Sequence, residues 1–369
     1  MTRVLVLNAG SSSLKWSVLD AATEAVAVQG TESWAEQDPG RHAAEVRAVL
    51  RRLPAVDAVG HRVVHGGATF REAVVVDAGV RTAIAELAAL APLHNPAALA
   101  GIDAVAEAWP ALPQVAAFDT AFHATMPEAA ALYPVPWDWT QRFGLRRFGF
   151  HGLSVMYAVR RARGLLLLGE VLRRLVVCHL GAGCSVTAVQ EGRSVDTSMG
   201  FTPLEGVMMA TRSGSLDPGL LLYLLQQGVP VADLDAALND RSGLLGVSGV
   251  AGDLRAVLAA ADGGDERARL AYAMFIHGLV RMVGAMVAVL GGLDALIFTG
   301  GIGEHSPRVR RDVAVAFASA GLRLDAAANE APARDVDVAP GDAAVRVLVV
   351  AAREDLAVLW EVKRVLALK

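Results

Sequence analysis

The length, composition and charge of the chain exclude several classes of protein. The chain has 369 residues, of which 54% are hydrophobic, and a formal net charge of −4 at pH 7. This length accommodates roughly two to three domains with their own cores. Because the charge is nearly balanced, no broad basic surface is expected, and we predict neither nucleic acid nor an anionic membrane as a partner.

The amino terminus and the cysteines indicate a cytoplasmic protein. A strand-like run begins at once, without the charged and hydrophobic regions of a signal peptide. Cys178 and Cys184 have a spacing that fits neither a CxxC pair nor a zinc motif, so we interpret them as buried free thiols. The apolar run 279–298 contains Arg281 and Asp294. A membrane-spanning helix needs about 20 predominantly apolar residues, so we predict a buried helix followed by a buried strand.

In chain order, short apolar runs typical of strands alternate with amphipathic segments typical of helices, which indicates an α/β fold. We expect strands at residues 3–8, 14–19, 56–63 and 114–118, with helices at 80–90 and 97–108. The order then restarts, with strands at 175–180, 185–190, 295–299 and 346–350 and helices up to residue 290, from 307 and from 354. The segment YPVPWDW, residues 133–139, contains two prolines and is expected to be irregular.

The restart is an internal repeat. VLVLNAGSSSLKWSVLD at 4–20 and LVVCHLGAGCSVTAVQEG at 175–192 each place a small Gly/Ser turn between two strands. Glycine permits a tight turn, and unpaired backbone N–H groups and Ser hydroxyls at its tip can bind phosphate oxygens. One such turn would be an ordinary hairpin. Two at matching places in two similar halves predict phosphate binding, with Lys15, the only lysine before Lys363, as a cation beside the first.

Other stretches carry residues suited to a small anionic ligand. Strand alternation in GHRVVHGG puts Arg62 on the face opposite His61 and Val63. A buried arginine next to Val64 suits a small carboxylate with a short alkyl tail. The pattern groups no further ligands with His61 for a zinc site. Asp119 follows a strand, where α/β sheets carry ligands.

The remaining candidates are weaker when each is considered alone. His151 in RRFGFHGLS has the features of a core histidine, and Arg212 in TPLEGVMMATRSGSLDP those of a surface arginine. In ALIFTGGIGEHSP, a glycine cluster follows a strand, and Ser306–Pro307 suits a helix start. Beside two phosphate turns, this cluster is a plausible nucleotide contact.

Taken together, the motifs resemble the acetokinase (acetate kinase) family, of the acetate and sugar kinase, Hsp70 and actin fold. The motifs in the family's order are NAGSSSLK, GHRVVHGG, PLHNP, FDTAFHATMP, RRFGFHG, CHLGAG, VDTSMGFTPLEGVMMATRSGSLDP, SGLLGVSG, TGGIGE and RED. They extend over nearly the whole chain. The stretch from SMGFTPLEG to TRSG is highly specific.

The resemblance implies an α/β protein with two domains of duplicated ribonuclease H-like βββαβαβα fold and an interdomain cleft. Residues 1–122 with the C-terminal helix 355–369 would form the N-terminal domain, and residues 123–354 the C-terminal nucleotide-binding domain. It also implies reversible, Mg²⁺-dependent transfer of the ATP γ-phosphoryl group to acetate, giving acetyl phosphate and ADP. A homodimer is implied as well, and residues 270–290 are a candidate for its interface or for the core.

The resemblance also assigns individual residues. Arg62, His151 and Arg212 match transition-state and substrate contacts, and Asp119 and Glu354 match catalytic acids that position the metal, together with Asn8. The phosphate turns contain Asn8, Ser11, Ser13 and Lys15 in the first and His179, Gly181 and Gly183 in the second. Adenosine-side contacts match Asp253, Leu254, Arg255, Gly301, Ile302 and Gly303. The acyl pocket matches Arg62, Val64, Leu93, Phe150 and Pro203.

Departures from the family pattern leave alternatives open. Ala182 replaces the usual asparagine of the second phosphate turn, and Leu153 and Val155 replace a hydroxyl residue and a second histidine. One alternative is therefore a degenerate paralogue that binds nucleotide with little catalysis. Another is a kinase for propionate or a further short acyl group, although Val64 favours acetate because its branched side chain fills the space of an extra methylene.

Overall fold

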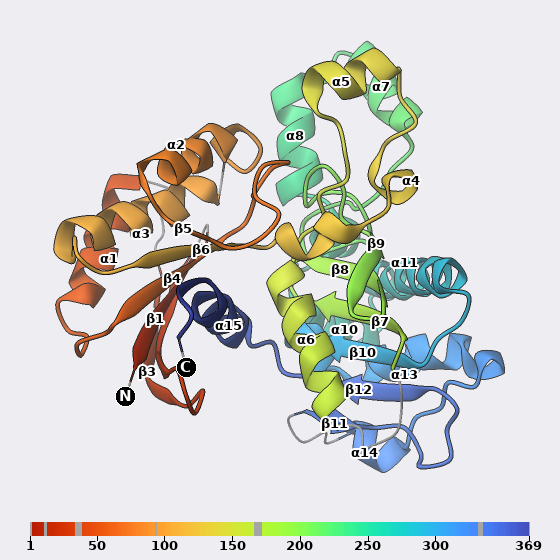
Figure 1. Cartoon of the computed structure of the whole chain (residues 1–369). Helices are drawn as coiled ribbons and strands as arrows, with labels where there is room; N and C mark the ends of the chain where they lie inside the picture. The colour runs from red at the N-terminus through yellow and green to blue at the C-terminus, as the bar shows by residue number, and fades with distance from the viewer. Residues whose placement is uncertain are drawn as a thin grey trace. The chain divides into compact units, whose positions relative to one another are not determined.

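The structure is a computed structural model that describes residues 2–10, 13–33, 39–92, 94–165, 172–330 and 335–368. The chain divides into two compact units (Figure 1). Unit 1 contains Met1–Ala124, Phe150–Tyr157 and Arg353–Lys369, and unit 2 contains Thr125–Gly149 and Ala158–Ala352. Residues 123–124, 150–157 and 353–354 belong to unit 1, whereas the predicted bounds place them in the second domain.

Unit 1 is built on a six-stranded sheet in the order β3-β2-β1-β4-β6-β5. Its strands are β1 (Arg3–Ala9), β2 (Ser13–Asp20), β3 (Val26–Ser33), β4 (Ala58–Val63), β5 (Val74–Val75) and β6 (Gln114–Phe118). β1, β4 and β6 are parallel to one another, whereas β2 and β5 run antiparallel to their neighbours. The carboxyl ends of three central strands therefore meet at one edge.

Helices cover both faces of this sheet. Leu7 and Val59 pack in one cluster with Val46 of α1 (Pro39–Leu50) and Val105 of α3 (Asn95–Ala108). α2 (Ala78–Glu86) and the short η1 (Leu87–Ala89) lie on the same side of the core. On the opposite face, a Cβ at Gly60 would meet Val358 of α15 (Glu354–Leu366). Since side chains alternate along a strand, Arg62 shares the face of α15.

Unit 2 repeats this sheet. Its order is β11-β12-β10-β7-β8-β9, which read backwards matches unit 1 strand for strand. The strands are β7 (Arg174–Leu180), β8 (Cys184–Gln190), β9 (Arg193–Thr197), β10 (Ala295–Thr299), β11 (Val336–Asp337) and β12 (Arg346–Val349). β1 and β7 have the same burial pattern along their lengths, with Asn8 and His179 at the same position. The predicted internal repeat is confirmed.

Unit 2 contains shorter helices before and after the long helix α11 (Glu266–Leu290). These are α4 (Glu128–Ala131), α5 (Trp137–Phe143), α7 (Pro218–Gln226), α8 (Val231–Asp240), α9 (Gly243–Ser248), α10 (Leu254–Asp262), and after β10, α12 (Gly300–His305), α13 (Pro307–Ala316), η3 (Ala318–Ala320) and α14 (Ala326–Glu330). α11 is the one described helix long and apolar enough to cross a membrane. Its buried residues, including Phe275, Leu279 and Val283, recur at helical spacing, and it packs on β8 and β7. It is therefore a core helix with an outer face.

Several local predictions are confirmed and others are wrong. Both cysteines are buried and free, and Ser306 caps α13 with Pro307 at its first turn. The edge strands β3, β5, β9 and β11 were missed because none carries a long buried apolar run. Residues 133–139 are not wholly irregular, since α5 begins right after Pro136, where proline is tolerated. The glycine cluster forms the short helix α12 rather than a loop.

Candidate active site

Arg62 is the centre of a polar cluster in unit 1. Its Nε donates to Asp119 Oδ1 at 3.2 Å, and its Nη2 donates to Oδ2 of the same carboxylate. Its Nη1 donates to Asn8 Oδ1 at 2.9 Å, and its Nε lies 3.4 Å from Glu354 Oε2. Asn8 Nδ2 donates to that Glu354 oxygen at 3.0 Å. One guanidinium thus holds two carboxylates and one amide.

Four separate elements bring these side chains together. Asn8 lies near the end of β1, Arg62 near the end of β4, Asp119 directly after β6, and Glu354 at the start of α15. Because the three strands are parallel, their ends deliver the side chains to one edge, which is where α/β sheets bind ligands. The structure therefore unites four predicted site residues.

Burial controls the charges in this cluster. The Asp119 side chain is fully buried, whereas those of Arg62 and Glu354 are 14% and 19% exposed. Burial raises the pKa of Asp119 to about 6, with Arg62 opposing the rise and the Glu354 carboxylate adding to it. Burial lowers the pKa of Arg62, but the two carboxylates outweigh it and the net pKa is raised. The guanidinium therefore stays charged at any physiological pH.

His151 and Gly152 close the backbone around Asp119. Gly152 N donates to Asp119 O at 3.0 Å, and a Cβ at Gly152 would lie 2.0 Å from that oxygen. His151 has a φ of 58°, which is rare for a residue other than glycine. Such strain persists only where the surroundings enforce it, and it clusters at functional sites. The helix α6 (Gly152–Leu165) starts here, and the backbone N–H of Leu153 also stabilises the Asp119 carboxylate.

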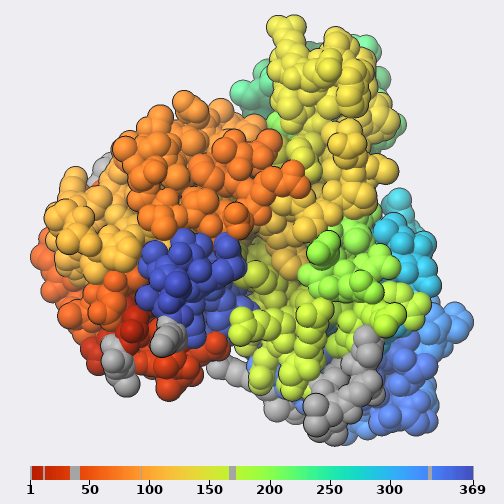
Figure 2. All heavy atoms as spheres, in the orientation of Figure 1, coloured from red at the N-terminus to blue at the C-terminus, as the bar shows by residue number. Residues whose placement is uncertain are grey.

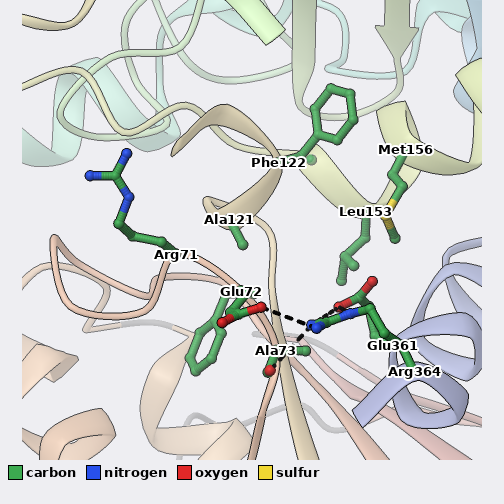
Figure 3. Close-up of a pocket in the computed structure, with 11 residues that line it drawn as sticks. Arg71, Glu72, Ala73, Ala121, Phe122, Leu153, Met156, Glu361 and Arg364 are labelled. Carbon is green, nitrogen blue, oxygen red and sulfur yellow. Dashed lines mark hydrogen bonds and ion pairs between the residues drawn. The ribbon is translucent and has the colours of Figure 1, made fainter. Parts of the chain in front are cut away.

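A pocket of about 320 Å³ in unit 1 adjoins this turn (Figure 3). Phe118 and Leu153 are among its lining residues, and Arg364 bridges Glu72 and Glu361 at its side. None of the predicted site residues is among those that line it. Leu153, which departs from the family pattern, thus directs its buried side chain to this pocket, while its backbone serves Asp119.

The two apolar residues of the predicted acyl pocket that the structure describes in unit 1, Val64 and Phe150, are buried. Val64 follows β4 and is 7% exposed, and Phe150 is 2% exposed. Phe150 meets the ring of His65 edge-on at 5.4 Å, and its carbonyl lies 2.9 Å from His123 Nε2. The Asn95 side chain accepts from the backbone N–H of His65 and donates to its carbonyl oxygen. Leu93 lies outside the described residues, and Pro203 belongs to unit 2.

Two of the buried histidines, His61 and His123, serve as packing and hydrogen-bonding groups. His61 Nε2 lies 2.7 Å from Gln114 Oε1. Burial lowers the pKa values of both His61 and His123 to about 4, so both are neutral near pH 7. In the described part of the chain, no group of three or more His, Cys, Asp or Glu side chains could hold a metal.

Each of the two turns predicted to bind phosphate is closed by a backbone hydrogen bond, which spans four residues in the first turn and three in the second. Gly10 N donates to Ser13 O at 2.9 Å, and Gly181 N donates to Gly183 O at 3.0 Å. Lys15 is paired with Asn8 across β1 and β2 and is exposed. Ser11 lies outside the described residues. A Cβ at Gly181 would come within 3.9 Å of His179 Nε2, so that side chain lies against the second turn.

Arg212 lies beside the second turn in unit 2. Ala210 N donates to Ala182 O at 3.1 Å, which joins the Arg212 loop to the turn. Arg212 Nη1 lies 3.5 Å from Pro203 O. Burial lowers the pKa of Arg212, with Cys184 and Asp240 opposing the shift. Among the residues that the structure describes, no carboxylate forms an ion pair with Arg212, so its donors can bind an anion.

The residues predicted to contact the adenosine side lie around the same strand ends of unit 2. A Cβ at Gly300 would lie 2.7 Å from Leu180 O, which puts the glycine cluster Gly301, Ile302 and Gly303 next to the second turn. Asp253 caps α10 with Leu254 as its first residue, and a Cβ on the preceding Gly252 would meet Ala210. Arg255 is 92% exposed and pairs with Asp253. The structure thus gathers the predicted residues of unit 2.

The cluster around Arg62 contains two carboxylates and one amide oxygen, fewer than three acidic or histidine side chains but of the donor type that a magnesium ion takes. Mg²⁺ prefers oxygen ligands and is usually held by one or two carboxylates, waters and substrate phosphates. Asp119 and Glu354 supply two carboxylates on one guanidinium, and Asn8 adds an amide beside them. Their oxygens are the donor type that this ion requires.

Sequence reasoning missed the residues that support the site. Gly152 is required by the 2.0 Å approach of Asp119 O, and Asn95 and His123 position the residues next to Val64 and His151. In each case a weak signal existed in the motifs RRFGFHG, PLHNP and FDTAFH. No local periodicity could reveal contacts between them.

Comparisons with known proteins agree on one family. A model of the acetokinase family matches residues 41–359. The acetate kinase of Nostoc punctiforme is 44% identical over 402 residues, covering 98% of this chain and 99% of that protein. The crystal structure of Porphyromonas gingivalis acetate kinase superposes with a TM-score of 0.91 at 36% identity, with full coverage of both chains.

Two further structures broaden the comparison. A propionate kinase from Francisella tularensis has a TM-score of 0.87 at 35% identity, covering 98% of this chain and 99% of that one. A putative N-acetylmannosamine kinase from Listeria monocytogenes has a TM-score of 0.52 at 13% identity, covering 98% of this chain and 99% of that one, which shows a shared fold alone.

The Arg62 cluster predicts a pH-dependent loss of stability for Arg62→Gln. Without the guanidinium, the ionised carboxylates of Asp119 and Glu354 face each other at pH 8, and urea unfolding should show a loss of about 3 kcal/mol. At pH 5, below the raised pKa of Asp119, that carboxyl is protonated and the loss should shrink. Arg323→Gln, in an exposed pair with Asp342, is the control and should change stability by less than about 0.5 kcal/mol. An equal loss at both pH values would contradict this account.

Proposed function

The chain belongs to the acetokinase family and has the two-domain fold of acetate and sugar kinases, and on this premise we propose that it is an acetate kinase. It transfers the γ-phosphoryl group of ATP to acetate, reversibly, giving acetyl phosphate and ADP. The observation that supports this best is the charged Arg62 held by Asp119 and Glu354 where three parallel strands end. Since ATP is a substrate, we propose a cytoplasmic location.

The chemistry needs alignment and charge neutralisation more than a protein nucleophile. Acetate is already an anion at neutral pH, so phosphoryl transfer to it requires no general base. Guanidinium groups bind carboxylate and phosphoryl oxygens through paired hydrogen bonds. Each unit supplies one arginine, Arg62 in unit 1 and Arg212 in unit 2. They offset the repulsion of two anionic reactants and stabilise charge on the transferred group. His151 donates a further hydrogen bond to it.

Magnesium would be held by Asp119 and Glu354, with Asn8 beside them. When bound, Mg²⁺ neutralises and orients the nucleotide phosphates. The chain's own residues position the acids: Arg62 and the Leu153 backbone hold Asp119, and Asn8 and Arg62 hold Glu354. Gly10, Ser13, Lys15 and the turn at Gly181–Gly183 would bind phosphate oxygens, and the α10 and α12 segments would bind the adenosine side.

Two alternatives remain from the sequence. The similarity to a propionate kinase supports propionate as an alternative substrate, but the buried, branched Val64 favours acetate. The degenerate-paralogue hypothesis rests on Ala182 and Val155. In the structure, Leu153 and Val155 are buried and Asp119 keeps its support from the Leu153 backbone, which favours retained catalysis.

We also propose a homodimer that forms through the outer face of α11. On this face Leu270, Met274 and Val289 are 54%, 45% and 54% exposed. Leu270 and Met274 are four residues apart and so are neighbours on the helix surface, and exposed apolar patches mark protein interfaces. A second exposed apolar surface lies on α5 and α7, where α5 is at the surface in yellow in Figure 2. The two surfaces make a matched pair for testing.

The first prediction is acyl phosphate formation that depends on both arginines. Purified protein with Mg-ATP, acetate and hydroxylamine should yield acetyl hydroxamate. Arg62→Ala and Arg212→Ala should each lower kcat by at least about 100-fold, because each removes a preorganised charge from the transition state. Arg323→Ala is the exposed control and should behave like the parent. If the parent binds ATP but forms no hydroxamate, the nucleotide-binding paralogue replaces this proposal.

The second prediction concerns acyl selectivity. Val64→Ala should raise kcat/KM for propionate relative to acetate by about tenfold, since one methylene in a fitted pocket is worth about 1–3 kcal/mol. Val63→Ala is the control, because Val63 lies on the opposite face of β4 in the core. A parent enzyme that already prefers propionate would sink the assignment of acetate as substrate.

The third prediction concerns assembly. Sedimentation velocity should show a dimer for the parent and a monomer for Met274→Glu, because a carboxylate would be buried unpaired at the interface. Leu222→Glu on α7, where Leu222 is 60% exposed, should leave the dimer intact. The reverse result would move the interface to α5 and α7.

A further inference from the structure

Residues 350–353, here named the strap, lead directly to Glu354. The strap follows β12, and the chain passes from unit 2 to unit 1 between Ala352 and Arg353. Glu354 is the first residue of α15 and contacts Asn8 and Arg62. The strap is therefore the covalent lead to one of the two acids in the proposed magnesium site.

Three consecutive backbone N–H groups of the strap are held within unit 2. Val350 N donates to Phe298 O of β10 at 2.9 Å, which continues the sheet. Ala351 N then donates to Asp335 Oδ1 at 3.0 Å, and Ala352 N donates to Glu304 Oε1 at 3.0 Å. Beyond the end of the sheet, carboxylate oxygens thus replace backbone carbonyls as the acceptors for these N–H groups. Such bonds to charged acceptors are stronger than neutral ones.

Asp335 is held firmly in its place. Its other oxygen accepts from Arg161 Nε of α6 at 2.7 Å, and its side chain is 13% exposed. Its φ is 55°, a conformation that costs an aspartate free energy and is kept where the surroundings enforce it. The chain also crosses between the two units within α6. Asp335 therefore links the unit 2 part of α6, through Arg161, to the strap.

Glu304 is held at the end of the glycine cluster. The fully buried Arg310 donates through Nη1 to Gly303 O at 2.8 Å and to Glu304 O at 2.9 Å. Its Nε and Nη2 bind Asn329. The backbone from which the Glu304 carboxylate reaches the strap is therefore anchored by a buried guanidinium.

We infer that Asp335 and Glu304 are positioning residues that hold the strap and so place the Glu354 carboxylate for the reaction. This inference rests on the proposed function, because it takes Glu354 as an acid of the magnesium site. Neither carboxylate has to touch the reactants for this role. Residues that orient a metal ligand from behind typically cost about 10–100-fold in metal affinity or activity when they are changed.

Asp335→Gly tests the inference in the full chain. Glycine tolerates the φ of 55°, so the change removes the carboxylate without adding strain. By hydrogen–deuterium exchange, we expect the amide of Ala351 to exchange about tenfold faster, since it loses its acceptor. In the hydroxamate assay, the free Mg²⁺ concentration for half-maximal rate should rise about tenfold. KM for acetate should stay within about twofold, because Arg62 and Val64 are untouched.

Matched variants separate positioning from general damage. Asp335→Asn keeps an acceptor and suits a left-handed backbone, so it should restore most of the Mg²⁺ response. Asp342→Ala removes an exposed carboxylate and should match the parent. If Asp335→Gly does not fold, Glu304→Ala carries the same test at the amide of Ala352.

The outcomes are distinct. Faster strap exchange with unchanged kinetics would make the two carboxylates structural only and overturn the inference, as would unchanged strap exchange. An equal rise in the Mg²⁺ concentration for half-maximal rate and in KM for acetate would also overturn it. A parent that yields no acyl hydroxamate would instead refute the proposed function, and the inference would fall with it.

Discussion

The proposed site in unit 1 depends on one charged contact, the guanidinium of Arg62 between Asp119 and Glu354. A buried carboxylate is costly unless it is paired and hydrogen-bonded, and Asp119 is fully buried. Arg62 provides the compensating charge, while the raised pKa of Asp119 shows that the compensation is incomplete. Such a pair adds little net stability. Its presence at the ends of three parallel strands is consistent with the proposed role of holding anionic reactants and a cation.

Gene duplication would explain how the remaining parts are arranged. The two sheets have the same strand order, and their first hairpins place Asn8 and His179 at equivalent positions with the same burial. The two copies have diverged in their charged groups. Unit 1 surrounds its arginine with carboxylates, whereas Arg212 in unit 2 has a carbonyl and a thioether nearby. The first arrangement suits a cation and a carboxylate substrate, and the second leaves donors for phosphate.

The departures from the family pattern become less disruptive once their surroundings are known. Leu153 and Val155 occupy buried positions of α6, and what Asp119 takes from this turn is backbone: an N–H from Gly152 to its carbonyl and one from Leu153 to its carboxylate. Ala182 contributes its carbonyl to Ala210, which any residue would provide. Side chains were exchanged where the backbone performs the positioning.

By itself, the sequence determined the α/β class, the internal repeat, the two glycine-rich turns and most central strands, because these depend on local patterns of apolar and turn-forming residues. It failed at the four edge strands, which lack a long buried run, and at the helical state of the glycine cluster. Tertiary structure alone decided that Asn8 meets Glu354, 346 residues later, and that Asp335 and Glu304 hold the strap. Such contacts arise where strand ends converge and the chain returns, and no local periodicity records that convergence.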